Sequence, residues 1–369
     1  MLLDKQARRL QKWVSVMGFG SAVVLGSALL MSSVTGCGGG SSKASSAKSG
    51  SNRPDPKAPL VEPPDPPPVT ANPLLGAKLF VDPQSLAMLR ANALRQTDAA
   101  KAALIDKIAN QPQGLWMGEW NSDIYRAVDH FVGRAQADGS VAVIIAYNVP
   151  HRDAAASAEE QGHSAGGLAS KEAYMRWIRD VHAGINNRPA VVVLEPDALP
   201  GLKSLSPEWQ AERLYLIKDA IKVLRQNPSA AVYIDAGHAA WLPAEEMAEL
   251  LKQAGVEYAS GFSVNTSNYR ATDECLEYGH KISELVGGKH FVIDTSRNGA
   301  GPYLEAKTPE ESWCNPPGRK IGQPPTTNTG DPIVDGFLWL KRPGESDGEC
   351  RGGPKAGAWW EEAAMEYVQ

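Results

Sequence analysis

Acidic side chains follow several short apolar runs of the sequence, at positions where strands would end. Asp153 and Asp197 each come shortly after a continuous apolar run, and so do Asp235, Asp294 and Asp347. Carboxyl groups that share one cleft repel one another and raise the pKa of at least one of them, which keeps a proton available near neutral pH. The pattern predicts general acid–base chemistry. For Asp294 alone we expect a structural role in a cap or turn.

Tryptophans accompany the same acidic segments. They stand among Gly, Asn and Glu rather than on helical stripes, and the set is Trp116, Trp120, Trp241, Trp313 and Trp339. Flat aromatic faces in loops often stay exposed for binding, and sugar rings stack on them. The tryptophans therefore indicate a carbohydrate substrate, although we expect Trp177 and Trp339 to lie in the core.

Two other chemistries fit the sequence less well. Gly162–Gly166 matches the G-x-S-x-G pattern of serine esterases, with Ser164 at its centre, but no hydrophobic strand precedes it. Asp235, His238 and His151 could ligate zinc, but the sequence has no H-E-x-x-H motif and no paired C-x-x-C. A serine hydrolase remains a weaker alternative, and we expect no metal or other cofactor.

From residue 72 onward, short apolar runs alternate with helical patterns. We expect strands at 78–81, 115–117, 141–147, 190–194, 231–234, 259–264, 290–293 and 337–340, and helices at 85–95, 170–185, 207–225, 243–254 and 273–286. Continuous apolar strands are typical of a parallel sheet covered on both faces. About seven or eight such units predict a closed α/β barrel, whose loops at the carboxyl ends of the strands carry the reactive groups. A doubly wound open sheet is the alternative, but no G-x-G-x-x-G turn supports it.

The first 71 residues have the composition of an export signal followed by a tether. Residues 1–13 are basic and residues 14–31 are apolar, and 34–37 (Val-Thr-Gly-Cys) resemble the lipobox of bacterial lipoproteins. We therefore expect a signal peptide at 1–36, a lipidated Cys37 and a tether at 37–71, rich first in Gly and Ser and then in Pro. A membrane-spanning anchor or a simply cleaved signal are the alternatives. The expected location is the outer face of a bacterial cell membrane, after secretion.

Charge and cysteine content narrow the class of protein further. Removal of residues 1–36 takes away four positive charges and one negative charge, so the formal net charge falls from -5 to -8. Such a chain is not expected to bind nucleic acid. Three cysteines then remain, Cys275, Cys314 and Cys350, and export predicts one disulfide and one leftover thiol. We expect a monomer with one catalytic domain at 72–369.

Seven motifs, in order, resemble those of glycoside hydrolase family 6, the inverting cellulases, over about four-fifths of the chain. They lie at 147–153, 193–197, 233–238, 265–269, 294–299, 327–331 and 341–348. The resemblance implies a distorted (β/α) barrel of about seven parallel strands, with a cleft at the C-terminal ends of the strands. It also implies hydrolysis of β-1,4-glucosidic bonds in cellulose or related β-glucans, with inversion at the anomeric carbon.

The resemblance assigns roles to the acidic residues. Asp197 would be the general acid, and Asp153 would raise its pKa and position water. Asp347 would be the candidate base, at about 6.5–9.5 Å from the acid so that water fits between them. Asp235 would tune the acid, and Tyr147 would press on the sugar at the cleavage point.

The same match implies substrate contacts and a disulfide. The expected contacts are Lys341 and Glu345 near the scissile bond, His238, Trp241 and Asn265 on the glycone side, Trp116 and Trp313 as stacking faces, and Ser164 as a water or sugar contact. A Cys314–Cys350 bridge would fasten the segment that carries Asp347 and leave Cys275 unpaired. Ala154 stands where many members have cysteine, so we expect no second bridge.

The segments that could roof the cleft are short. Residues 297–313 and 347–359 imply an open groove, which favours an endoglucanase over a cellobiohydrolase of the same family. Without a visible carbohydrate-binding module, soluble or amorphous glucan is the expected substrate. A catalytically inactive surface glucan-binding protein is the alternative from another class, and the presence of Asp153, Asp197 and Asp347 counts against it.

Overall fold

The computed structural model describes residues 53–69, 71–153 and 166–369. These residues belong to one compact unit, Ser51–Gln369. The predicted signal peptide and Cys37 lie outside the described residues. Within the described ranges, we find no helix of the length and apolar character that a membrane span requires.

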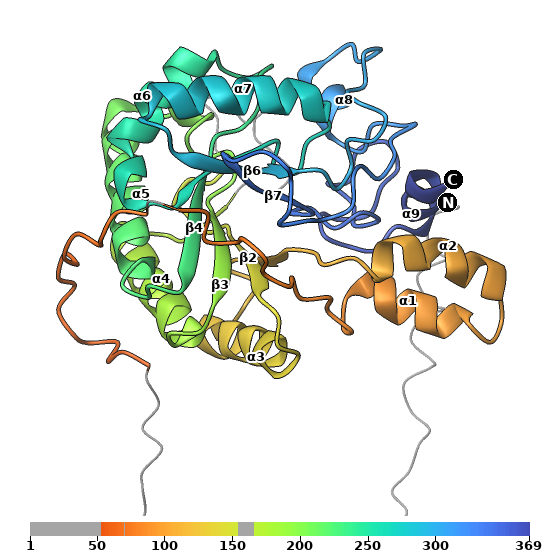
Figure 1. The fold of residues 1–369 in the computed structure, drawn as a ribbon, viewed down its shortest axis with the longest axis horizontal. Coiled ribbons are helices and arrows are strands. Elements are labelled where there is room, and N and C mark those ends of the chain that lie inside the picture. Colours follow the sequence, from red (N-terminus) through yellow and green to blue (C-terminus); the bar gives the residue numbers. More distant parts are fainter. Residues whose placement is uncertain (1–52, 70, 154–165) are drawn as a thin grey trace, which may run out of the picture. The chain divides into compact units, whose positions relative to one another are not determined.

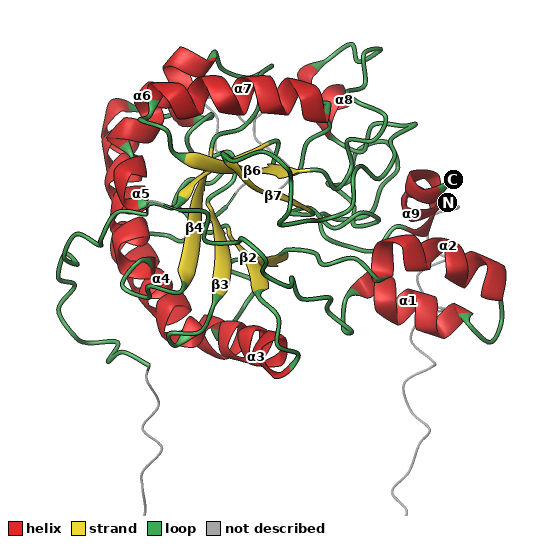
Figure 2. Ribbon diagram, viewed as in Figure 1, coloured by secondary structure: helices red, strands yellow, loops and turns green. Residues whose placement is uncertain are grey.

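Seven parallel strands form one sheet, in which each strand pairs with the next along the chain. The strands are β1 (Leu115–Met117), β2 (Ala142–Ala146), β3 (Ala190–Leu194), β4 (Ala230–Asp235), β5 (Gly261–Val264), β6 (His290–Asp294) and β7 (Val334–Leu338). The sheet curls, so that its edge strands β1 and β7 approach each other. The Gly114 N–H, just before β1, donates to the Trp339 carbonyl, just after β7, at 2.8 Å, and the Trp116 indole donates to the Leu340 carbonyl at 3.0 Å. The distorted barrel of about seven parallel strands is confirmed (Figure 2). The closed barrel expected from the number of units is wrong, because β1 and β7 lie at the two edges of the sheet and are not paired.

Helices precede, connect and follow the strands. They are α1 (Leu86–Leu94), α2 (Ala99–Ala109), α3 (Ile124–Ala137), α4 (Lys171–Ile185), α5 (Pro207–Leu224), α6 (Ala244–Gln253), α7 (Thr272–Leu285), α8 (Pro309–Trp313) and α9 (Glu361–Val368). Figure 1 shows α3 to α7 along the sheet, with α1, α2 and α9 grouped apart from them. Ser170 and Ser206 cap α4 and α5 by accepting backbone N–H groups of the first turn.

Apolar side chains fill the space on both sides of the sheet. One cluster lies between the strands and α3 to α7, and another lies inside the barrel, where it includes Val143, Val191 and Tyr233. Every residue of β2, β3 and β4 is buried. This burial explains the uninterrupted apolar runs in the sequence. It also leaves the strand ends as the places where polar groups can reach solvent.

Two parts of the sequence-based fold need correction. The strand expected at 78–81 is a single parallel bridge between Leu79 and Val141, because the chain then turns at Asp82 and Pro83 into α1. The helices α2, α3, α8 and α9 were not predicted. Of these, α2 and α9 pack with Tyr269 and Trp339 in a cluster formed by distant parts of the chain, which no local pattern reveals.

Residues 53–69, which we name the strap, lie along α4 and α5 (Figure 1). Side chains of α4 and of the two residues after α5 donate hydrogen bonds to strap carbonyls: Arg176 to Ala58 (3.1 Å), Arg179 to Val61 (2.9 Å), Gln226 to Pro64 (3.0 Å) and Arg225 to Pro67 (3.2 Å). Leu60 packs against the core and Pro66 is buried. This part of the predicted tether is therefore docked on the catalytic domain, because the carbonyls of a proline-rich segment have no internal hydrogen bonds and can accept from a neighbour.

Candidate active site

A cavity of about 850 Å³ lies at the carboxyl ends of the strands. Ten of the predicted site residues line it: Trp116, Tyr147, Asp153, Asp197, His238, Trp241, Trp313, Lys341, Glu345 and Asp347. They come from β1, from the segments that follow β2, β3, β4 and β7, and from α8. The topology thus brings together side chains that are more than 200 residues apart in the chain, as expected at this end of a parallel barrel.

Asp197 is the carboxyl group most suited to hold a proton. Burial, together with the nearby charges of Asp235 and Asp153, raises the pKa of Asp197 well above its ordinary value. Burial also raises the pKa of Asp235, to about 6. However, Asp235 accepts hydrogen bonds from the backbone N–H groups of Asp197 (3.0 Å) and Gly237 (3.1 Å) and from the Ser263 hydroxyl (3.3 Å). These donors favour the charge on Asp235 and leave the proton on Asp197.

Asp153 is held by the tyrosine predicted to contact the sugar. The Tyr147 hydroxyl donates to Asp153 Oδ2. The Tyr147 ring lies edge-to-face with Trp116, at 5.0 Å between centroids. The Arg152 guanidinium lies 4.3 Å from the centroid of the Tyr147 ring. Burial, followed by the charge of Asp153, raises the pKa of Tyr147 well above 10. Tyr147 therefore remains a hydrogen-bond donor to Asp153 at any working pH.

Asp347 is a buried carboxylate surrounded by donors. Arg297 Nη1 lies 2.8 Å from both of its oxygens, and Lys341 Nζ, the Tyr269 hydroxyl and the Asn315 N–H lie at 3.2, 3.0 and 3.1 Å. Burial alone would raise the pKa of Asp347, but Arg297 and Lys341 outweigh it and lower this pKa to about 2. The group is ionised throughout the range in which enzymes work.

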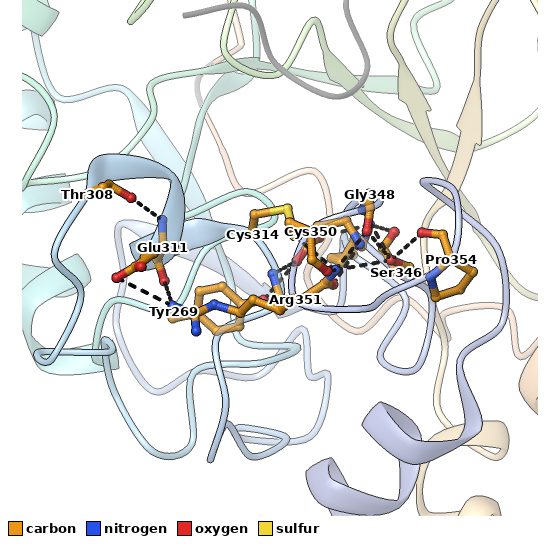
Figure 3. Close-up of a disulfide and its surroundings, with 12 residues drawn as sticks. Tyr269, Thr308, Glu311, Cys314, Ser346, Gly348, Cys350, Arg351 and Pro354 are labelled. Atoms are coloured by element: carbon orange, nitrogen blue, oxygen red, sulfur yellow. Dashed lines mark hydrogen bonds and ion pairs between the residues drawn. A yellow bond between two sulfur atoms is a disulfide. The ribbon is translucent and has the colours of Figure 1, made fainter. Parts of the chain in front are cut away.

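A disulfide fixes the segment that carries Asp347 (Figure 3). Cys314 and Cys350 are bonded at 2.01 Å, which confirms the expected pairing, and Cys275 is a free buried cysteine. Asn315 is the residue after Cys314. Its side-chain oxygen accepts the Asp347 N–H at 2.9 Å, and its side-chain nitrogen donates to the Gly348 carbonyl at 2.9 Å. Backbone and side chain of Asp347 are thus both held from the segment that begins at Cys314.

Buried carboxylates at the strand ends tie neighbouring loops together. Glu195, after β3, accepts the N–H groups of Asn148 (2.9 Å) and Val149 (3.0 Å) from the loop after β2. Asp294, at the end of β6, accepts N–H groups from the loops after β5 and β7: Ser267 at 2.8 Å, Leu340 at 3.3 Å and Lys341 at 3.1 Å. The expected structural role of Asp294 is confirmed, and Asp235 acts on the loop after β3 in the same way.

Some predicted residues are not brought to the cleft. Asn265 is fully buried and donates to the Asp294 carbonyl at 2.8 Å, so it shapes a loop rather than lining the cavity. Asp235 is also fully buried, and Ser164 lies outside the described residues. Trp339 is buried, as expected for a core residue.

A metal role for the histidines is not supported by their surroundings. His238 faces the cavity, and burial lowers its pKa to about 4, so it is neutral. Over the described ranges, we find no cluster of three or more His, Cys, Asp or Glu side chains suited to a metal ion.

Sequence reasoning missed several residues of the cleft. Thr266, Ser267 and Asn268 line it, and their motif at 265–269 had signalled the loop but not which side chains face the cavity. Arg213 lines it too, from within α5, where nothing in the helical pattern marks it. Arg297 binds Asp347 and lies in the motif at 294–299.

Comparison with known proteins places this geometry in a family. The model for glycosyl hydrolases family 6 matches residues 74–369. The chain is 43% identical to Endoglucanase A of Cellulomonas fimi over 292 residues, which is 79% of this chain and 60% of that protein. It is 39% identical to Endoglucanase 1 of Streptomyces halstedii, over 78% of this chain and 88% of that protein.

A solved structure agrees with the sequence comparison. The endoglucanase Cel6 of Mycobacterium tuberculosis, solved in complex with methyl-cellobiosyl-4-deoxy-4-thio-β-D-cellobioside, has a TM-score of 0.75 at 43% identity. The match covers 81% of this chain and 98% of that structure. With the family model matching most of the sequence, the chain belongs to glycosyl hydrolases family 6.

Proposed function

We propose that this protein is an endoglucanase that hydrolyses internal β-1,4-glucosidic bonds of cellulose or related β-glucans, with inversion of the anomeric configuration. The observation that carries the proposal is a tryptophan-lined cleft that brings together Asp197, whose pKa is raised well above its ordinary value by burial and by the charges of Asp235 and Asp153, and Asp347, whose pKa is lowered to about 2 by Arg297 and Lys341. Relatives that share about two-fifths of the aligned residues are named endoglucanases. The ligand of the Mycobacterium tuberculosis enzyme is a thio-linked cellobioside, which supports a β-glucan substrate.

In this mechanism the proton of Asp197 goes to the glycosidic oxygen as the bond to the anomeric carbon breaks. Water then adds to the opposite face of the sugar and releases one proton. Asp153, fixed by Tyr147, orients that water. The ionised Asp347 stabilises the positive charge that develops on the sugar ring.

The destination of the water's proton follows from the surroundings of Asp347. A carboxylate with a pKa of about 2 that already accepts from Arg297, Lys341 and Tyr269 is a weak base. Asp347 remains the candidate base, and a chain of water molecules that ends at Asp153 is the second route. Either route returns the site to its starting charge once Asp197 regains a proton.

The experiment measures the viscosity of carboxymethylcellulose and the anomeric form of released cello-oligosaccharides, for wild type and Asp197→Asn. Early loss of viscosity, an α-anomer as first product and a fall in kcat of about 10²–10⁴-fold in the variant are expected. The exposed Asp138→Asn serves as control and should match wild type. A β-anomer would overturn inversion, and wild type that binds glucan without cleaving it would point to a surface binding protein.

We further propose export and lipid anchoring at Cys37, on the support of the basic and apolar segments and the Val-Thr-Gly-Cys sequence at 34–37. In a bacterial host, the full chain is expected in the membrane fraction with a lipid-modified N-terminal peptide. Cys37→Ser should lose the lipid. A wild-type chain whose N-terminal peptide has no lipid by mass spectrometry would contradict the proposal.

A further inference from the structure

The segment that carries Asp153 is held without a covalent tie. The sequence has no cysteine between Cys37 and Cys275, so no disulfide fastens this segment. Within it, His151 and Asp153 have φ values of 57° and 52°, in the left-handed region that residues other than glycine rarely adopt. Such a conformation persists only where the surroundings over-determine it. Contacts from other elements must therefore fix the direction of Asp153.

Arg213 supplies one such contact from α5. The side chain is buried, and its Nη2 donates to the Pro150 carbonyl at 2.9 Å and to the His151 carbonyl at 2.6 Å. Its Nη1 lies 3.3 Å from the carbonyl of Ala198, the residue after Asp197. A guanidinium forms strong, directional hydrogen bonds to such oxygens. One side chain thus joins the segments that carry the two acids.

Trp209 supplies a second contact from the same face of α5, one turn before Arg213. Its ring is stacked on the His151 imidazole, at 3.5 Å between centroids and 13° between planes. The residue is 43% exposed, so it covers the outside of the segment while Arg213 binds it from within.

We propose that Trp209 and Arg213 are positioning residues for Asp153: together they hold residues 150–153 in the conformation that aims its carboxylate at the acid. This inference rests on the proposed function. If the segment relaxes, Asp197 loses a nearby negative charge, whereas Asp235 from β4 and the Tyr147 hydroxyl stay in place. The proton on Asp197 is then held less tightly, so activity is lost at a lower pH on the alkaline side.

The test uses Trp209→Ala, which changes no charge and removes an exposed side chain. Misplacement of a catalytic group by about 1 Å can cost up to 100-fold in rate, so we expect kcat on cellotetraose to fall by about tenfold. We expect KM to stay unchanged and the alkaline limb of the kcat profile to move to lower pH. Trp209→Phe keeps a flat ring over His151 and should restore most of the rate. The control is Tyr215→Ala, since Tyr215 is equally exposed, at 43%, on the same helix.

Hydrogen exchange gives a readout that does not depend on activity. Backbone amides of residues 151–153 should exchange faster in Trp209→Ala than in wild type and Tyr215→Ala. Unchanged exchange would overturn the proposal even if wild type proved inactive on glucans. A raised KM with unchanged kcat would instead make Trp209 a sugar-stacking face. A lower Tm with unchanged kcat and unchanged pH profile would reduce both residues to a purely structural role.

Discussion

Asp197, which is partly exposed at the cavity, and the fully buried Asp235 are two carboxyl groups that differ in what donates to them. Asp235 accepts from two backbone N–H groups and a hydroxyl, whereas the Asp197 side chain lies at the cavity. The donors favour the ionised form of Asp235, and this charge in turn raises the pKa of Asp197. The division of roles between acid and neighbour is therefore set by hydrogen bonds from the loops after β3 and β4 and from β5.

Replacement of Asp235 should lower the pKa of Asp197. Asp235→Asn keeps an oxygen for the Asp197 N–H but removes the charge, so the pKa of Asp197 falls. Asp197 acts only while protonated, and activity is lost as pH rises through its pKa, so the alkaline limb of kcat should move to lower pH and kcat at pH 7 should fall by roughly tenfold or more. A pH profile on cellotetraose measures this, with Asp331→Asn, which pairs with His280 instead, as control. An unmoved alkaline limb would contradict this division of roles.

At the scale of elements, the strand ends are joined by Glu195, Asp235 and Asp294 rather than by contacts between the loops alone. Asp294→Asn replaces one accepting oxygen by an amide that must face backbone N–H donors. We expect a loss of about 3 kcal/mol in the free energy of unfolding, since donors are left unpaired in a buried place. Urea denaturation checks it, with the exposed Asp138→Asn as control. If Asp294→Asn lowers the free energy of unfolding no more than the control does, the loops keep their positions without the hydrogen bonds to Asp294.

The sequence predicts those parts of the fold and the site that depend on neighbours along the chain. The apolar runs at 141–147 and 190–194 identify β2 and β3, and the carboxylates after them are found because a strand end is a local signal. The direction of a loop side chain depends on partners that are distant in the sequence. Asn265 was expected in the cleft, but its side chain donates to the Asp294 carbonyl and is therefore buried. Arg213 is missed for the same reason, because its partners belong to other loops.

For the whole molecule, the strap extends the folded catalytic domain toward the N-terminus, from the expected start at residue 72 to residue 53. Lys222 of α5 is 7% exposed and pairs with Glu62 at 2.8 Å and with Asp65 at 2.7 Å. A cation this well covered has lost much of its hydration, and the two strap carboxylates replace it. The Tyr258 hydroxyl also donates to Asp65, at 3.0 Å. The strap therefore supplies both carboxylates that pair with Lys222.

A chain shortened to begin at residue 72 should be less stable than one that begins at Ser51. Loss of Leu60 and Pro66 exposes apolar surface worth about 2 kcal/mol, which lowers Tm by roughly 4–8 °C. The variant Lys222→Met then tests whether the loss of stability comes from the contacts of the strap with α5 or only from the shortening of the chain. It should lower Tm more where the strap is present, because two ion pairs are then lost, than in the shortened chain, where Lys222 has already lost both carboxylates. Equal effects of Lys222→Met in the two backgrounds, by scanning calorimetry, would mean that the strap does not bind there in solution.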